Sequence, residues 1–319
     1  YYARELEKEQ YDISCWNEGW HRLLKTASRS LDFAIERSAE GVTLLLHFEA
    51  PGVDNFSQRI MLHALKPLVT MTAAFHKQEV RTPESLYFAF PLVLAKDWRC
   101  HFDTAGVAVE LDVEQLPGAS RDWFTVDSYV ALHDGAYGMA LFCPDAPMIQ
   151  AGGFNFGRRS KAIVREENPL LLAWPLNNYW DTNFRPAQPG FISLTWHMTG
   201  FAAFDAAEVK KEAEGLKGGI EVHPALVMPP VREGRWLEIS EPDIHLLHAR
   251  RAQDGRGIIL RLINLGEEEL ETTVCVAGMV RAGRVTVLEE VVEGLPVSQG
   301  RFSLRMPYRA ILSVRLYRS

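Results

Sequence analysis

The feature that most constrains the fold is a long series of short apolar runs, rich in branched and aromatic residues and separated by residues that favour turns. Residues 84–94 are the clearest of these runs. In an extended strand, Leu86, Phe88 and Phe90 would share one side and Tyr87 the other. Such a pattern predicts strands that bury at least one face, and its repetition along the chain predicts an all-β protein.

Further runs of strand length recur before residue 205. In residues 191–199, Leu194, Trp196 and Met198 would face a core while the residues between them face outward. Asp134-Gly135 is a hairpin turn signal between two runs. The remaining predicted strands of this part cover residues 42–48, 58–64, 67–75, 107–111, 126–133 and 137–142.

One helix interrupts the strands. Asp205 is the expected N-cap, Glu208 completes a capping box, and Gly215 is expected to end the helix. Residues 218–233 then look like a proline-containing linker. The runs beyond it predict a small antiparallel sandwich with strands at residues 244–251, 257–263, 270–276, 284–290, 302–305 and 309–317.

Composition limits the class of protein. The chain has 319 residues, 47% of them apolar, so it can build a sizeable core. A net charge of −7 argues against a nucleic-acid partner, and no apolar run is long enough to span a membrane. The four cysteines lie far apart in sequence, which favours free thiols in a reducing, cytoplasmic compartment. Because the first residue is Tyr rather than Met, we expect a piece of a longer protein.

The loop at residues 173–184 is the main candidate for binding. It places two aromatic rings among carboxamides, a carboxylate and a hydroxyl. Stacking faces beside planar hydrogen-bonding groups suit a sugar ring. The alternative is a structural loop, because Asn and Asp also cap turns, and composition alone favours that alternative. The candidate sugar-binding residues in this loop are Asn177, Asn178, Tyr179, Trp180, Asp181 and Asn183.

Glu84 and the Asp122-Trp123 pair are further candidates, since each carboxylate stands beside aromatic residues. Glycoside cleavage requires two carboxylates at a defined separation. Each carboxylate alone also suits a turn cap or a surface ion pair. His245 and His248 are three residues apart on a predicted strand, so they are expected on opposite faces and make no metal site.

Several motifs together resemble the C-terminal region of glycoside hydrolase family 38, the α-mannosidase family. They are the run at 84–91, the loop at 115–118 with Asp122-Trp123, the loop at 177–184, the segment 145–153 and the tail from 260 to 314. The resemblance implies a galactose-mutarotase-like super-sandwich at residues 1–228 and a small antiparallel sandwich at 229–319. In that family a barrel domain carries the zinc and the catalytic residues. No matching zinc-ligand motif is found in this sequence, so no catalytic or metal residue is assigned to this chain, and zinc is expected only in the missing domain.

The first hypothesis for function is therefore the non-catalytic β portion of an α-mannosidase-like glycoside hydrolase, inactive alone. Its partners would be a mannose-containing carbohydrate and its own N-terminal catalytic domain, with no nucleic acid and no membrane. The alternatives are a free-standing carbohydrate-binding module using Tyr179 and Trp180, and a mutarotase-type epimerase using residues such as His197 and Glu84. A purely structural docking role would leave an apolar patch exposed, for example near Trp16 or Trp20.

Overall fold

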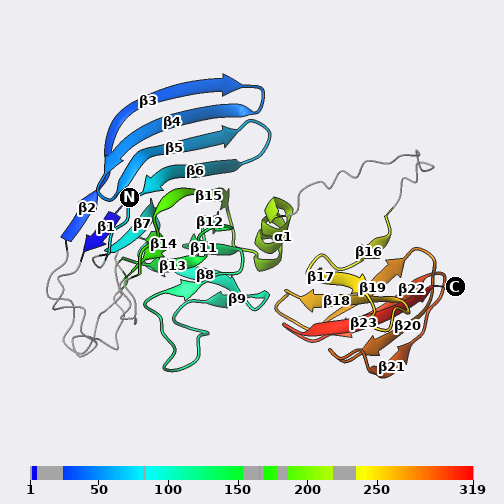
Figure 1. Ribbon diagram of the computed structural model, residues 1–319. Coiled ribbons are helices and arrows are strands. Elements are labelled where there is room, and N and C mark those ends of the chain that lie inside the picture. Colours follow the sequence, from blue (N-terminus) through cyan, green and yellow to red (C-terminus); the bar gives the residue numbers. More distant parts are fainter. Residues whose placement is uncertain are drawn as a thin grey trace. The chain divides into compact units, whose positions relative to one another are not determined.

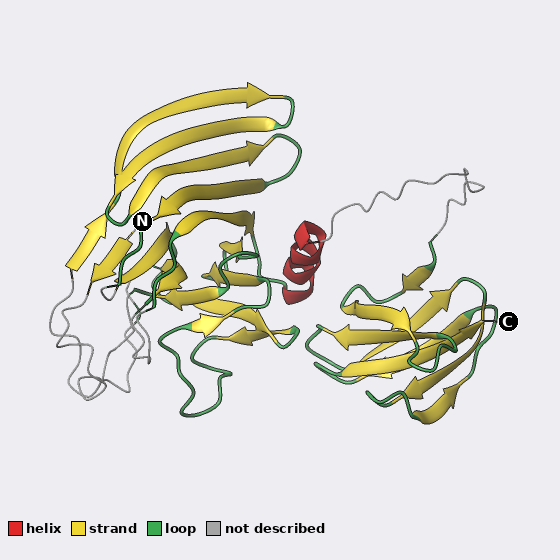
Figure 2. Cartoon of the chain, in the orientation of Figure 1, coloured by secondary structure: helices red, strands yellow, loops and turns green. Residues whose placement is uncertain are grey.

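The computed structural model describes residues 2–5, 24–81, 84–153, 165, 169–178, 186–217 and 235–318. The chain divides into two compact units, Tyr1–Phe204 and Asp205–Ser319. Strands dominate both units, and α1 is the only helix among the described residues (Figure 2). The domain boundary expected at 228/229 lies outside the described residues.

The first unit contains two antiparallel sheets (Figure 1). Among the described residues, one has nine strands in the order β3-β4-β5-β6-β15-β12-β11-β8-β9, and the other has six in the order β10-β13-β14-β7-β1-β2. The strands are β1 (Tyr2–Glu5), β2 (Leu24–Ala27), β3 (Arg29–Ser38), β4 (Gly41–Ala50), β5 (Val53–His63), β6 (Leu68–Lys77), β7 (Glu84–Pro91), β8 (Arg99–Thr104), β9 (Val107–Glu110), β10 (Phe124–Thr125), β11 (Tyr129–His133), β12 (Gly138–Phe142), β13 (Met148–Ala151), β14 (Leu170–Asn177) and β15 (Gly190–Phe201).

The second unit begins with α1 (Ala206–Lys217) and continues as a small sandwich. Within the described part of this unit, a three-stranded sheet has the order β16-β19-β22 and a five-stranded sheet the order β17-β18-β23-β20-β21. The strands are β16 (Leu237–Ile239), β17 (Ile244–Arg251), β18 (Ile258–Asn264), β19 (Leu270–Val276), β20 (Met279–Val285), β21 (Val291–Leu295), β22 (Arg301–Met306) and β23 (Ile311–Arg318).

The core of the first unit fills the space between its two sheets. Leu86, Phe88 and Phe90 of β7 all enter it, as their spacing predicts. The ring of Phe88 lies 4.6 Å from that of Trp196 on β15 and 6.2 Å from that of Phe56 on β5. These contacts join the middle strands of both sheets through aromatic rings, whose large buried area contributes strongly to stability.

The predicted hairpin at Asp134 is confirmed, since β11 and β12 pair from Tyr129↔Phe142 to His133↔Gly138. The Asp134 carboxylate accepts hydrogen bonds from the backbone N–H groups of Ala136 and Tyr137 at 2.9 and 3.1 Å. The turn is therefore closed by a side chain that stands in for a backbone acceptor.

Helix α1 begins as predicted but does not end at Gly215. The Asp205 carboxylate accepts hydrogen bonds from the backbone N–H groups of Ala207 and Glu208 at 2.9 and 3.0 Å. Gly215 lies inside the helix, which reaches Lys217. Its φ is not positive, so the glycine does not act as a terminator here.

Two expectations for the second unit are wrong. Residues 284–290, expected to form one strand, are instead the end of β20 and the turn to β21. In this turn Val287 is 71% exposed and Leu288 75% exposed. His245 and His248 are not on opposite faces, because a β-bulge at Leu247 shifts the register. They lie opposite Ile263 and Arg261, which alternate on one face of β18, so the two histidines share that face.

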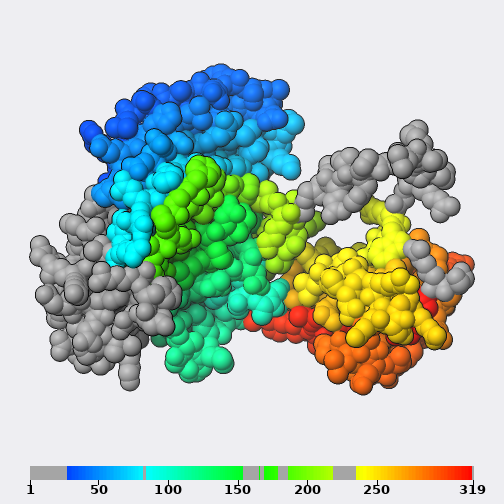
Figure 3. All heavy atoms as spheres, viewed as in Figure 1, coloured from blue at the N-terminus to red at the C-terminus, as the bar shows by residue number. Residues whose placement is uncertain are grey.

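An apolar surface lies at one end of the nine-stranded sheet, on strands β3 to β5, which Figure 3 shows in blue. The pairings Phe33↔Leu46, Ile35↔Leu44 and Val42↔Leu62 put these residues on the face that elsewhere packs on the core. The exposed fraction is 68% for Phe33 and 57% for Ile35. We call the exposed residues Leu31, Phe33, Ile35 and Leu62 the β3–β5 apolar surface.

The expectation of an all-β chain, with a large sandwich followed by a small antiparallel one, is confirmed by these sheets. The described residues up to Ser38 form strands β1, β2 and β3. Trp16 and Trp20 lie outside the described residues. Among the described residues, no helix is both long enough and apolar enough to cross a membrane.

A pair of phenylalanine substitutions tests the assignment of core and surface. Phe56 is 2% exposed and Phe33 68% exposed. We expect Phe56→Ala to lower the free energy of unfolding by about 3–5 kcal/mol, because it leaves a cavity between the sheets. Phe33→Ala should change that free energy by less than about 1 kcal/mol. Urea denaturation followed by tryptophan fluorescence measures both, and equal losses would contradict the assignment.

Candidate functional site

The candidate site lies where strands β7 and β14 of the six-stranded sheet run side by side. Asn177 is paired with Ser85 and Leu176 with Leu86. The register shifts between Ala173 and Leu176, next to Pro175, which has no N–H to give to the ladder. The pairing brings the predicted residues Asn177 and Asn178 beside the predicted Glu84.

Asn178 is a structural residue of this corner. Its Oδ1 accepts a hydrogen bond from the backbone N–H of Glu84 at 2.6 Å, and its own backbone N–H donates to the Glu84 carbonyl at 3.1 Å. Its Nδ2 donates to the carbonyl of Val80 at 3.0 Å. The Asn178 side chain therefore hydrogen-bonds to the backbone of both Glu84 and Val80, as the structural-loop interpretation predicts.

Glu84 pairs with Lys77, a residue that the sequence analysis did not select. The Lys77 Nζ contacts Glu84 Oε1, and only 6% and 12% of the two side chains are exposed. Lys77 shares a face with Ala73 and Phe75 of β6, and Glu84 shares one with Leu86 of β7, so the pair lies between the two sheets. A buried ion pair depends on both partners, because either charge alone would be desolvated without compensation.

A small cleft of about 100 Å³ opens at this corner. Asn177 is half-buried, and its Oδ1 atom is buried without a hydrogen-bond partner among the described residues. A buried acceptor of this kind can take a hydroxyl donor from a ligand. The cleft is lined by Lys77, Val80, Glu84, Ser85, Leu86, Leu176, Asn177, Asn178, Pro186, Ala187 and Gln188.

An aromatic layer covers the face of the six-stranded sheet that points away from the core. The Trp174 indole N–H donates to Ser85 Oγ at 2.8 Å, and the Tyr87 ring stacks on Trp174 with centroids 5.4 Å apart. The predicted Trp123 meets Trp174 edge-on at 5.9 Å. Trp174 is 1% exposed, so its ring is part of the structure and presents no open stacking face.

The predicted site residues thus fall into three groups. Glu84, Asn177 and Asn178 come together at the cleft, while the half-buried Asp122 and Trp123 adjoin the aromatic layer through Trp174. Tyr179, Trp180, Asp181 and Asn183 lie outside the described residues. Lys77 and Ser85 were missed, and the only signal for Lys77 was a cation ending an otherwise apolar run.

The acid and base considered for an epimerase are not brought together. His197 belongs to β15 of the nine-stranded sheet and points away from the core, because Trp196 and Met198 face it. Its Nδ1 lies 3.0 Å from Thr70 Oγ1, and the same hydroxyl lies 2.8 Å from His63 Nε2. Glu84 belongs to the other sheet and points into the sandwich.

A second titratable cluster lies on β8 and β11. Nε2 of His133 and Nδ1 of His101 are 3.0 Å apart, and the Phe204 ring stacks on His101 at 4.4 Å. Burial, then the neighbouring His133, lowers the pKa of His101 from 6.5 to about 4, against an opposing effect of Glu110. Burial also lowers the pKa of His133. Glu110 itself is held by Arg99 at 2.7 Å.

Within the described part of the chain, no three His, Cys, Asp or Glu side chains are placed to hold a metal ion together. The shared face of His245 and His248 supplies two histidines without a third such group among the described residues.

Comparison with known proteins gives a likeness of fold. No protein-family model and no curated protein matches the chain. A glycosyl hydrolase family 38 protein from Enterococcus faecalis superposes with a TM-score of 0.65 at 10% identity, covering 92% of this chain and 37% of that one. An α-mannosidase from E. faecalis V583 gives 0.63 at 12% identity, covering 92% and 36%. Galactose 1-epimerase from Lactobacillus acidophilus NCFM gives only 0.36 at 10% identity, covering 54% and 67%.

The expected resemblance to glycoside hydrolase family 38 is therefore confirmed at the level of fold. Identities of 10% and 12% show the fold alone. This chain spans a little over a third of the length of those two structures, at 37% and 36%.

A double-mutant cycle tests the ion pair at the cleft. We expect Lys77→Met or Glu84→Met alone to lower the free energy of unfolding by about 3–5 kcal/mol, because each removes the ion-pair partner of a buried charge. The double variant should lose much less than the sum of the two. As a control, Lys211→Met breaks an exposed pair with Glu208, whose side chains are 64% and 62% exposed, and should cost under about 1 kcal/mol. Additive losses at Lys77 and Glu84 would contradict the assignment.

The histidine cluster predicts a pH dependence of stability. Between pH 6.5 and about 4 the unfolded chain binds a proton at His101 that the folded chain does not. The unfolded state therefore gains protons as pH falls, and stability decreases across this window. His101→Gln should make the dependence shallower in urea denaturation measured at several pH values, whereas His248→Gln controls for the loss of one exposed histidine. An unchanged slope in His101→Gln would refute the prediction.

Proposed function

We propose that this chain is the non-catalytic β portion of an α-mannosidase-like glycoside hydrolase. It supports carbohydrate binding and hydrolysis by a barrel domain that carries the zinc and the catalytic residues. The observation that carries the proposal is the asymmetry of the fold match. The match takes in 92% of this chain but only 37% of the family 38 structure, as we expect if this chain corresponds to a part of such an enzyme.

The small size of the cleft suits a site that contacts only part of a sugar. At about 100 Å³ it is smaller than the roughly 300–1,000 Å³ of a pocket that encloses a small-molecule ligand. It can accept hydroxyl groups at the edge of a sugar whose ring is held elsewhere. Asn177 Oδ1 provides a buried acceptor without a hydrogen-bond partner among the described residues, and Lys77 and Glu84 also line the cleft. We propose a mannose-containing carbohydrate as the ligand, with Asp122, Trp123 and residues 177–183 around it.

The β3–β5 apolar surface supports docking on the catalytic domain. Leu31, Phe33, Ile35 and Leu62 are each between 54% and 68% exposed, and the strand pairings place Phe33, Ile35 and Leu62 on one sheet face. An apolar surface shared by neighbouring strands is a common mark of an interaction site. The partner in this proposal is the N-terminal catalytic domain of the same enzyme.

The described cysteines support a reducing compartment such as the cytoplasm. Cys100, Cys143 and Cys275 are free thiols. Burial raises the pKa of both Cys100 and Cys143, which keeps them protonated and unreactive.

An activity assay tests the non-catalytic role. We expect the chain to release no nitrophenol from an aryl α-mannoside, with or without added Zn²⁺, because the catalytic residues belong to another domain. Hydrolysis that needs Zn²⁺ and stops on chelation would overturn this part of the proposal. An unrelated aryl β-glucoside serves as the control for background hydrolysis.

Calorimetric titration tests the binding role with the same protein. We expect mannose or mannobiose to bind, and Asn177→Ala to weaken binding about two- to tenfold, the loss of one hydrogen bond. Gln253→Ala removes an exposed amide of the small sandwich and should leave binding unchanged. The assignment of the cleft is overturned if the folded chain binds neither sugar. It is also overturned if the Asn177→Ala variant binds the sugars as tightly as the original chain does.

A further inference from the structure

A pocket of about 600 Å³ opens within the small sandwich, apart from the candidate site. Trp236 stands just before β16, Ile258 begins β18, and Leu316 lies near the end of β23. The volume falls within the roughly 300–1,000 Å³ of pockets that bind small molecules. Its lining residues are Trp236, Ala249, Arg250, Arg251, Gly255, Gly257, Ile258, Val276, Met279 and Leu316.

The walls of this pocket are mainly apolar. Trp236, Ile258 and Leu316 also pack on the core of the small sandwich, which holds them in place. The backbone N–H of Ala277 donates to the Trp236 carbonyl at 3.0 Å and so anchors the tryptophan. Such walls favour a ligand with an apolar body, because they offer few partners for a ring of hydroxyl groups.

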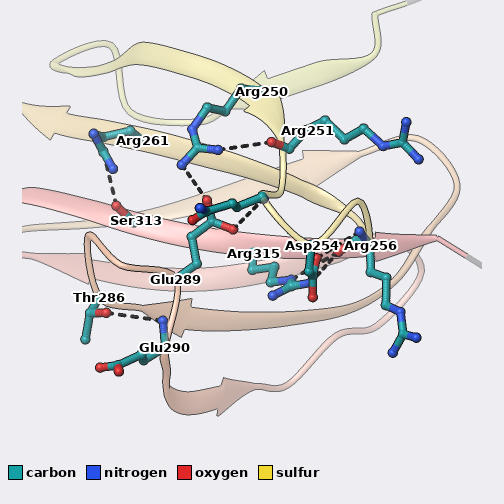
Figure 4. Close-up of polar contacts among 11 residues, drawn as sticks. Arg250, Arg251, Asp254, Arg256, Arg261, Thr286, Glu289, Glu290, Ser313 and Arg315 are labelled. Carbon is teal, nitrogen blue, oxygen red and sulfur yellow. Dashed lines mark hydrogen bonds and ion pairs between the residues drawn. The ribbon is translucent and has the colours of Figure 1, made fainter.

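The charged lining residues of the pocket are Arg250 and Arg251, and Figure 4 draws them with Arg315 and with the acidic partners Glu289 and Asp254. Arg250 pairs with Glu289, which is nearly buried, and Glu289 also accepts a hydrogen bond from the backbone N–H of Gln253 at 2.9 Å. Arg315 pairs with Asp254 at 2.5 and 2.6 Å. These two arginines are therefore neutralised within the protein.

Arg251 differs from both. Its side chain is exposed and extends away from the Arg250–Glu289 pair in Figure 4. Its Nε donates to the Gly255 carbonyl at 3.2 Å, and it has no carboxylate partner among the described residues. Gly255 has a φ of +75°, and a Cβ there would lie 3.5 Å from Arg251 Nη2, so the guanidinium lies close over the glycine. This contact orients the group while its Nη atoms can still donate.

We propose that this pocket binds a small amphipathic anion, with its apolar body against Trp236, Ile258 and Leu316 and its anionic head on Arg251. A carboxylate or sulfonate matches the planar guanidinium, which donates two parallel hydrogen bonds. The inference does not rest on the proposed function, because the pocket belongs to the second unit and the sugar cleft to the first.

Fluorescence titration of the whole chain with anilinonaphthalene sulfonate tests this site. The probe joins an aromatic body to an anionic head. Arg251→Gln should weaken its affinity about tenfold, and Arg251→Lys by less, because lysine keeps the charge but not the planar fork. Arg305→Gln is the matched control, since Arg305 lies on β22 with 69% of its side chain exposed. Phe33→Ser controls for probe bound to the β3–β5 apolar surface.

Competition separates the two parts of the ligand. Octanoate should displace the probe, whereas equal concentrations of acetate, which lacks the apolar body, and octanol, which lacks the charge, should not. The proposal is overturned if the probe does not bind, if Arg251→Gln binds as tightly as the original chain, if Arg305→Gln loses as much, or if acetate or octanol competes as well as octanoate.

Discussion

Strand β7 is buried on both faces, and the larger unit is organised around it. Leu86, Phe88 and Phe90 face the core between the sheets, while Ser85 and Tyr87 face the aromatic layer with Trp174. Burial of large side chains on both sides is the dominant stabilising contribution available to such a strand. It also fixes the pairing register of β7, because a shift of one residue would exchange the two faces and place Ser85 in the apolar core.

The polar residues at the start of β7 follow from that constraint. Glu84 points into the sandwich, where the opposite charge of Lys77 compensates for its loss of water. Asn178 completes the corner by bonding to the backbone on both sides. Asn177, on the other face, keeps an acceptor without a partner among the described residues. One corner therefore contains both the groups that close the sandwich and the acceptor atom that we propose meets a ligand.

The sequence predicted the strands whose side chains alternate, such as β7 and β15, because the period of two is visible without knowledge of the partner strand. The prediction from sequence failed where pairing with a neighbouring strand decides which residues form the strand. Most of the run at 284–290 belongs to an exposed turn, while Met279–Val285, which contains two arginines and a glycine, forms the strand because β23 and β21 pair with it. The bulge that puts His245 and His248 on one face is likewise set by pairing with β18. For the site, Glu84 and Asn178 were selected, but Lys77 was not, since its partner joins it only through the packing of two sheets.

We propose that the corner of β7 and β14 meets a carbohydrate without catalysing its cleavage. Hydrogen–deuterium exchange of the chain, with and without saturating methyl α-mannoside, tests this proposal. We expect slower exchange confined to peptides that cover the end of β6, the start of β7 and the end of β14, with no chemical change in the glycoside. Protection located only elsewhere, or no protection under conditions where the sugar is bound, would contradict it.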